Sequence, residues 1–254
     1  MKVQGQAALV TGGGSGLGEA TARELARMGA KVAVLDVNKA GAERVAAEIG
    51  GIAIECDITN TDSVSAAIEA AEKAHGPARI LMNIAGIGTA KRVVGKDGSA
   101  APLESFAKVV QVNLIGTYNM SRLFAAACVK LDPMEDGERG VMMFTASVAA
   151  FDGQVGQQAY SASKGGIVGM TLPMARDLAQ HGIRVCTIAP GLFATPLMKE
   201  LPEAVQESLA KSIPFPPRLG KPEEFAELAA HIVTNGHLNG EVIRLDGALR
   251  MAPR

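Results

Sequence analysis

Short runs of apolar and β-branched residues alternate along the chain with longer stretches that have helical spacing. Seven runs lack the polar alternation of a half-exposed strand, so each is predicted to be a strand buried on both faces. These runs are Ala7–Thr11, Val32–Asp36, Ile52–Cys56, Ile80–Asn83, Val141–Thr145, Val185–Ala189 and Val242–Leu245. Helical spacing between them is found, for example, over Leu17–Met28, Asp62–His75, Phe106–Lys130, Ser161–Gln180 and Pro222–Asn235.

The alternation of strand and helix predicts the fold class. Strands that are separated by helices are expected to be parallel and joined by right-handed crossovers. No linker-like segment interrupts residues 1–254, so we predict a single α/β domain with a doubly wound parallel sheet, a Rossmann fold with helices on both faces. Length alone leaves the number of domains open, because 254 residues accommodate one large domain or two small ones.

Two segments interrupt this alternation, and each follows the carboxyl end of a predicted strand. Residues 86–102 form a polar excursion, and residues 191–220 form an apolar, proline-rich excursion. Ligands of open α/β sheets bind at the carboxyl ends of the strands. We therefore expect both excursions to be walls of a substrate site, with a lid at about residues 191–220.

Composition and charge narrow the classes of function. Hydrophobic residues make up 48% of the chain and charged residues 20%, as in folded globular domains. The 25 Lys and Arg residues are balanced by 26 Asp and Glu residues, which gives a nucleic-acid partner little electrostatic support. Neither a signal peptide nor a membrane-spanning run is recognisable, so we expect no membrane partner and a cytoplasmic location, or the mitochondrial matrix in a eukaryotic cell.

Cysteine and histidine do not form the pattern of a metal site. Cys56, Cys128 and Cys186 are far apart and odd in number, so we predict buried thiols in a reducing compartment rather than disulfides. The four histidines lack the spacing of metal ligands. We therefore expect the protein to have no metal.

A glycine-rich turn, Thr11–Gly18, directly follows the first predicted strand and begins a helix. Glycines allow the backbone to approach a pyrophosphate, and the start of a helix offers N–H groups to the anion. A tight turn between a strand and a helix would have the same pattern without binding a ligand. Asp36 ends the second strand, where a carboxylate would bind the adenosine ribose and repel a 2′-phosphate. Because neither the turn nor Val37 provides a cation, NAD is favoured over NADP, with Lys39 as the nearest cation in the sequence.

Tyr160 and Lys164 are four residues apart and thus on one face of a predicted helix. A phenol has a pKa of about 10, so proton exchange near neutral pH requires that a nearby charge stabilise the phenolate. Ser147, after the fifth strand, would hold or polarise a substrate oxygen. Asn113, in a predicted helix, would anchor a water chain to Lys164. A Tyr–Lys pair alone is a weak signal, because such pairs also arise by chance on surface helices.

Taken together, these motifs resemble the short-chain dehydrogenase/reductase family in order and spacing over essentially the whole chain. The matching features are the TGGGSGLG turn, Asp36, the turn at Asn83–Gly86, Asn113, Ser147, Tyr160 and Lys164. Ile84 departs from the asparagine or small residue that is usual in the family. Because this turn supports the adenine side of the cofactor, we expect the departure to do little damage.

The resemblance is strongest to members that oxidise L-3-hydroxyacyl-CoA to 3-ketoacyl-CoA with NAD, in fatty-acid or branched-chain breakdown, as homotetramers. It implies the catalytic residues Ser147, Tyr160, Lys164 and Asn113. It implies cofactor contacts by Gly12, Ser15, Gly16, Leu17, Gly18, Asp36, Asp57, Ile58, Ala85, Gly86, Tyr160, Lys164, Phe193 and Thr195. It implies substrate contacts by Ser147, Gln154, Tyr160, Lys91 and Leu197.

Two further functions stay open at this point. A related oxidoreductase would act on a steroid, another secondary alcohol or an acyl carrier protein thioester, because the site and not the fold sets the substrate. A nonenzymatic scaffold subunit is disfavoured by the presence of all four catalytic residues. Lys91, Arg92 and Lys96 in the polar excursion are candidates for binding the phosphates of coenzyme A, with a solvated charged loop as the alternative.

Overall fold

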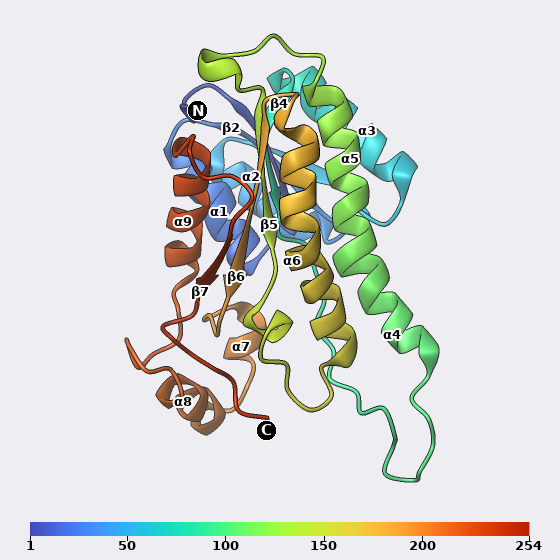
Figure 1. The fold of residues 1–254 in the computed structure, drawn as a ribbon. Helices are drawn as coiled ribbons and strands as arrows, with labels where there is room; N and C mark the ends of the chain where they lie inside the picture. The colour runs from blue at the N-terminus through green and yellow to red at the C-terminus, as the bar shows by residue number, and fades with distance from the viewer. Residues whose placement is uncertain (254) are drawn as a thin grey trace.

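A parallel sheet of seven strands forms the centre of the protein in the computed structural model (Figure 1). The structure describes residues 1–253, and for Leu197 and Lys199 it describes the backbone alone. The strands are β1 Ala7–Thr11, β2 Lys31–Asp36, β3 Ile52–Glu55, β4 Ala78–Asn83, β5 Gly140–Thr145, β6 Ile183–Pro190 and β7 Val242–Leu245. Their order is β3-β2-β1-β4-β5-β6-β7, and all neighbouring pairs are parallel.

Helices cover both faces of the sheet and enclose two apolar cores. They are α1 Gly16–Arg27, α2 Lys39–Ile49, α3 Thr61–His75, α4 Leu103–Val110, α5 Thr117–Cys128, α6 Gln158–Ala179, α7 Pro196–Lys199, α8 Glu203–Lys211 and α9 Pro222–Thr234. The buried side chains of α1, α2 and α9 pack on one face, and those of α3, α5 and α6 pack on the other (Figure 1). The predicted doubly wound α/β fold is thus confirmed.

The predicted strands agree with the structure, whereas one predicted helix is interrupted. The stretch Phe106–Lys130 consists of α4, a π-helical turn at Gln111–Gly116, and α5. Gly116 faces Ile58 so closely that a Cβ would lie 2.7 Å from the Ile58 side chain. The helix α2 begins after an Asn38 cap on the Gly41 amide, so Lys39 lies in its first turn.

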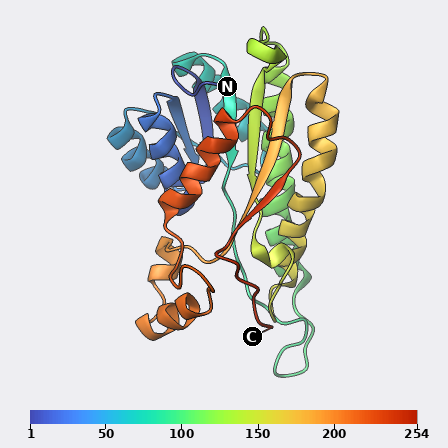
Figure 2. The same ribbon diagram turned by 60° about the vertical axis from the view of Figure 1, so that its left-hand side comes forward.

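The chain order reverses between β1 and β4, which are adjacent at the centre of the sheet. Such a switch point leaves a crevice at the carboxyl ends of the strands. Both excursions lie at this end of the molecule (Figure 2). The polar excursion contains an isolated bridge between Val94 and Ala100, and the apolar excursion contains α7 and α8.

The cysteines and the hydropathy of the helices can now be compared with the structure. Cys56, Cys128 and Cys186 are buried and unpaired, as predicted. Among the helices within residues 1–253, none is both long and apolar enough to cross a membrane.

Candidate active site

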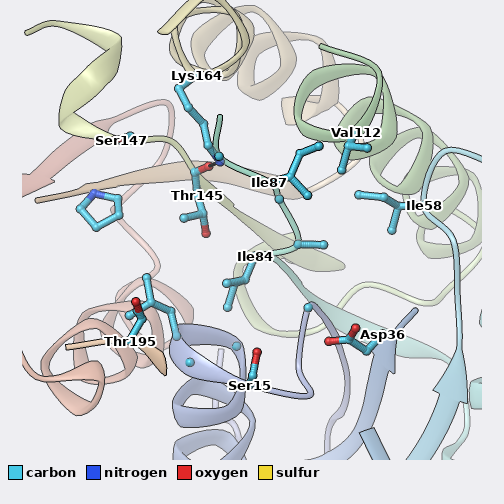
Figure 3. A pocket seen from close by; sticks show the side chains of 18 of the residues that line it. Ser15, Asp36, Ile58, Ile84, Ile87, Val112, Thr145, Ser147, Lys164 and Thr195 are labelled. Atoms are coloured by element: carbon cyan, nitrogen blue, oxygen red, sulfur yellow. Dashed lines mark hydrogen bonds between the residues drawn. The ribbon is translucent and has the colours of Figure 1, made fainter. Parts of the chain in front are cut away.

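A cavity of about 830 Å³ lies at the carboxyl ends of the central strands (Figure 3). Ser15 and Asp36 are at one end of this cavity, and Ser147 and Lys164 are at the other (Figure 3). The cavity is lined by every residue predicted to contact the cofactor, namely Gly12, Ser15, Gly16, Leu17, Gly18, Asp36, Asp57, Ile58, Ala85, Gly86, Tyr160, Lys164, Phe193 and Thr195. The structure therefore brings the predicted nucleotide residues and the catalytic candidates Ser147, Tyr160 and Lys164 into one space.

Two glycines of the turn between β1 and α1 have no space for a side chain. Gly12 has a φ of 65°, and a Cβ there would lie 2.8 Å from the Ala85 backbone. A Cβ at Gly18 would collide with the Gly12 carbonyl. Ser15 precedes α1 without a side-chain cap, so the first N–H groups of the helix stay available for an anion. The turn therefore fits the diphosphate of a dinucleotide.

Asp36 is fixed at the end of β2 by two backbone amides. One carboxylate oxygen accepts a hydrogen bond from the Gly14 amide at 3.0 Å, and the other accepts one from the Asn38 amide at 2.9 Å. These bonds hold a negative charge next to the glycine-rich turn. A carboxylate in this place suits ribose hydroxyls and opposes a 2′-phosphate.

A cation that the sequence reasoning did not consider lies near the same end of the cavity. The Arg44 guanidinium, from α2, donates to the Gly14 carbonyl at 3.2 Å. It also donates to both carboxylate oxygens of Glu19, at 3.0 Å and 2.6 Å. Arg44 and Arg23 share the carboxylates of Glu19 and Glu48, and Lys39 lies 3.9 Å from Glu43. Cation charge near Asp36 is therefore balanced within the protein.

Ser147, Tyr160 and Lys164 converge from two elements. Ser147 follows β5 and begins a short 3-10 turn, in which its hydroxyl accepts a hydrogen bond from the Ala149 amide at 3.1 Å. Tyr160 and Lys164 lie one turn apart on α6, and the Lys164 Nζ is 5.8 Å from the centroid of the Tyr160 ring. Lys164 is 4% exposed, and its Nζ donates to the Thr145 carbonyl at 2.7 Å (Figure 3).

Burial changes the pKa of both titrating groups on α6. Desolvation raises the pKa of the Tyr160 phenol, and a hydrogen bond with Ser147 opposes this effect. Desolvation lowers the pKa of Lys164 to about 8. Burial therefore holds the phenol in its protonated form, and the lowering of its pKa by Lys164 together with bound NAD stays a prediction.

Asn113 lies in the π-helical turn behind the cavity wall. Its Oδ1 accepts from the Ile87 amide at 2.8 Å, and its Nδ2 donates to the Ile87 carbonyl at 2.9 Å and to the Ser163 hydroxyl at 3.0 Å. A Cβ on Gly86 would lie 3.1 Å from Asn113 Oδ1 and 3.4 Å from Lys164 Nζ. Asn113 therefore fixes the chain next to Lys164, and the water chain between the two side chains stays a prediction.

Lys91 and Gln154, two of the predicted substrate residues, are not among the described residues that line the cavity. The Lys91 amide donates to the Gly156 carbonyl at 2.7 Å, and its Nζ donates to the Ser105 hydroxyl at 3.2 Å. The Gln154 side chain donates to the Ala252 carbonyl at 2.9 Å. Leu197 is part of α7, but its side chain lies outside the described residues. Direct substrate contact by these three residues stays a prediction.

Sequence reasoning missed the contribution of α4 and the following π-helical turn to the cavity. Lys108, Gln111 and Val112 line it from this side. The helical pattern of this stretch is visible in the sequence. No motif in the sequence marks the π-helical turn after α4, so the side chains of this stretch that face the cavity could not be identified.

Comparison with known proteins gives the family. The chain matches the model of the short chain dehydrogenase family over residues 6–206. The chain belongs to the short-chain dehydrogenase family. This confirms the resemblance that the motifs indicated and makes the protein an oxidoreductase.

Relatives match this short-chain dehydrogenase over almost its full length. The 3-hydroxyacyl-CoA dehydrogenase type-2 of Drosophila melanogaster is 51% identical over 254 residues, covering 99% of this chain and 100% of the relative. The human protein of that name is 52% identical and covers 99% of this chain and 97% of its own. A crystal structure of 3-hydroxyacyl-CoA dehydrogenase type-2 from Mycobacterium avium superposes with a TM-score of 0.95, at 46% identity and 98% coverage of both chains.

A second solved structure resembles the protein with its cofactor bound. It is the 3-ketoacyl-(acyl-carrier-protein) reductase from Brucella melitensis, complexed with NADH. The TM-score is 0.87 and the identity 36%, and the match covers 98% of this chain and 100% of the other.

Proposed function

We propose that the protein interconverts L-3-hydroxyacyl-CoA and 3-ketoacyl-CoA with NAD as its redox cofactor. The observation that carries this proposal is the convergence of Ser147, Tyr160 and Lys164 on the same cavity as the glycine-rich turn and Asp36. The 3-hydroxyacyl-CoA dehydrogenase type-2 relatives, at 51% and 52% identity, support the choice of substrate class. The NADH-bound neighbour supports the choice of cofactor.

The glycine-rich turn and the start of α1 would hold the diphosphate of NAD, and Asp36 would accept hydrogen bonds from the adenosine ribose. Lys164 at the opposite end of the cavity would hold the nicotinamide ribose. NAD, when bound, supplies the hydride acceptor and a positive charge next to the reacting carbon. The glycine-rich turn fits this role because it lines the cavity and the start of α1 has no side-chain cap on its first N–H groups.

Proton transfer is the part of the reaction that the protein's own residues perform. Ser147 holds the substrate hydroxyl, and Tyr160 accepts its proton as the carbonyl forms; in the reverse direction Tyr160 returns the proton. Ser147 is suited to this role because it lines the same cavity as Tyr160. Asn113 keeps the wall next to Lys164 in place through its two bonds to Ile87.

The remaining parts of the proposal concern coenzyme A, assembly and compartment. Lys91, Arg92 and Lys96 lie exposed in the polar excursion at the substrate end and would bind the phosphates of coenzyme A. A homotetramer is supported by apolar side chains exposed on and between α4 and α5, namely Leu103, Phe106, Ile115 and Tyr118. Unpaired buried cysteines agree with the reducing cytoplasm or the mitochondrial matrix.

A substrate panel tests the proposed function. Wild-type protein is expected to oxidise NADH with acetoacetyl-CoA, and Tyr160→Phe is expected to lower kcat by at least about a hundredfold, the usual contribution of a general acid or base. Steroids, free secondary alcohols and acyl carrier protein thioesters are compared under the same conditions. Faster turnover of any of these compounds would refute the acyl-CoA assignment, and no turnover of any would favour the scaffold alternative.

A further inference from the structure

The loop that follows Ser147 is held by the C-terminal end of the chain. We call residues 151–156 the substrate loop and residues 246–253 the C-terminal tail. The Val155 amide donates to the Pro253 carbonyl at 3.1 Å, and the Gln154 side chain donates to the Ala252 carbonyl at 2.9 Å. The tail thus runs beside the substrate loop at the end of the molecule where the cavity lies (Figure 2).

A single arginine at the end of β7 joins the same two segments. The Arg244 side chain is 21% exposed and donates to an Asp152 oxygen at 2.6 Å. It also donates to an Asp246 oxygen at 2.7 Å and to the Leu249 carbonyl at 2.9 Å. Its guanidinium lies 5.1 Å from the centroid of the Phe151 ring. A planar guanidinium with fixed N–H directions is suited to hold several acceptors in one geometry.

The substrate loop continues directly from the turn that carries Ser147. The Ala150 amide donates to the Ser147 carbonyl at 3.0 Å. The amides of Phe151 and Asp152 both donate to the Val148 carbonyl at 2.9 Å. Asp152 is therefore bonded to Arg244 through its side chain and to the turn of Ser147 through its backbone.

The opposite side of the substrate loop contacts the polar excursion. The Lys91 amide donates to the Gly156 carbonyl at 2.7 Å. The substrate loop thus lies between the excursion proposed to bind coenzyme A and the C-terminal tail. None of the nucleotide-contacting residues predicted above belongs to either the loop or the tail.

On the basis of the acyl-CoA activity proposed above, we propose that the C-terminal tail is a positioning element that orders the substrate loop for acyl-CoA. Gln154 and Arg244 are the positioning residues through which it acts. A loop that is already ordered loses less conformational entropy when substrate binds, and this difference appears as affinity. The tail therefore lowers KM for the acyl-CoA and leaves KM for NADH unchanged, because its bonds connect through the substrate loop to the turn of Ser147 and not to the glycine-rich turn or Asp36.

This role differs from direct contact of Gln154 with the substrate, and a double-mutant cycle separates the two. The variants are Gln154→Ala, a truncation after Met251, and the combination of both. The truncation is expected to raise KM for acetoacetyl-CoA by about tenfold, the effect of one or two net hydrogen bonds. Gln154→Ala is expected to raise KM by a smaller factor, and the combination is expected to equal the truncation alone.

If the increase in KM of the combined variant equals the product of the two single increases, Gln154 acts on the substrate without the tail, and the proposal is overturned. An unchanged KM for acetoacetyl-CoA after truncation would also overturn it. The wild-type assay keeps this test separate from the test of the proposed function. A wild-type protein that does not reduce acetoacetyl-CoA would refute the function, whereas an active wild type with an unaffected truncation would refute the positioning role alone.

Arg244 is tested against Arg184, a buried arginine. Arg184 also donates to several backbone carbonyls, those of Ile232, Val233 and Leu238. It lies at the amino end of β6, away from the carboxyl ends of the strands where Arg244 lies. Arg244→Met and Arg184→Met are both expected to lower Tm, and only the Arg244 variant is expected to raise the ratio of KM for acetoacetyl-CoA to KM for NADH. Arg244→Lys keeps the charge and replaces Arg244→Met if the latter does not fold. Equal ratios in the Arg244 and Arg184 variants would overturn the role of Arg244.

Discussion

Lys164 illustrates a conflict between catalysis and stability that can be measured in the protein without nucleotide. Its amine is 4% exposed, and burial lowers its pKa from 10.5 to about 8. At pH 7 the folded protein therefore holds a buried ammonium, whose cost is about 3 kcal/mol relative to an ammonium in water. Lys164→Met removes this cost, so the variant is expected to be more stable at pH 7 although its turnover is lost.

The size of the effect changes with pH in a defined direction. Because the pKa of Lys164 is lower in the folded state than in the unfolded state, the destabilisation is fully present below pH 8 and disappears as the pH rises toward 10.5. At pH 9.5 the cost has fallen to about 1.5 kcal/mol. The variant also loses the hydrogen bond to the Thr145 carbonyl, which reduces its gain in stability by about 1 kcal/mol at either pH. The free energy of unfolding of Lys164→Met is thus expected to exceed that of the wild type by about 2 kcal/mol at pH 7 and by about 0.5 kcal/mol at pH 9.5.

Urea unfolding followed by far-ultraviolet circular dichroism at the two pH values measures these differences, since the chain has no Trp to serve as a fluorescent probe. Lys73→Met, at an exposed position of α3, is the matched control and is expected to show no difference between the two pH values. A gain for Lys164→Met that is the same at both pH values would contradict the assignment of the cost to the ammonium. A loss of stability at pH 7 that exceeds the loss at pH 9.5 would refute the reasoning altogether.

Three further changes test other parts of the site. Asp36→Ala is expected to lower the preference for NAD over NADP in kcat/KM by about tenfold. An unchanged preference would mean that another group selects the cofactor. Bound NAD with a ketoacyl-CoA is expected to slow limited proteolysis within residues 191–220, and equal cleavage with and without them counts against a lid. Replacement of Lys91, Arg92 and Lys96 by Ala is expected to raise KM for acetoacetyl-CoA but not for a short thioester without the nucleotide. Equal loss on both substrates would point to a folding defect instead.

Much of the fold and of the nucleotide site could be predicted because the signals are local. A central parallel strand is buried on both faces, so it reads as a continuous apolar run, and β6 over Ile183–Pro190 is buried throughout. The glycine-rich turn combines a strand end, closely packed glycines and a helix start within a few residues. Asp36 ends the neighbouring strand, so its position follows once the parallel order is known.

Contacts made by long side chains across the fold could not be predicted in this way. Arg44 reaches the Gly14 carbonyl and Glu19 from another helix, and Arg244 reaches Asp152 across 92 residues. Nothing in the local sequence distinguishes these arginines from solvated ones. The same holds for the π-helical turn at Gln111–Gly116, because no residue type in the sequence marks its i→i+5 hydrogen bonds.

The pair on α6 shows why spacing alone does not determine catalytic chemistry. Four-residue spacing places the Lys164 ammonium near the Tyr160 ring, and this proximity favours the phenolate. Burial acts on both groups in the opposite sense, since it raises the pKa of the phenol and lowers the pKa of the amine. With a pKa of about 8, Lys164 still carries its proton at pH 7, whereas Tyr160 stays a phenol. The fold therefore supplies a charged lysine and a positioned phenol, and the positive charge that NAD carries when bound is the component that would complete the stabilisation of the phenolate.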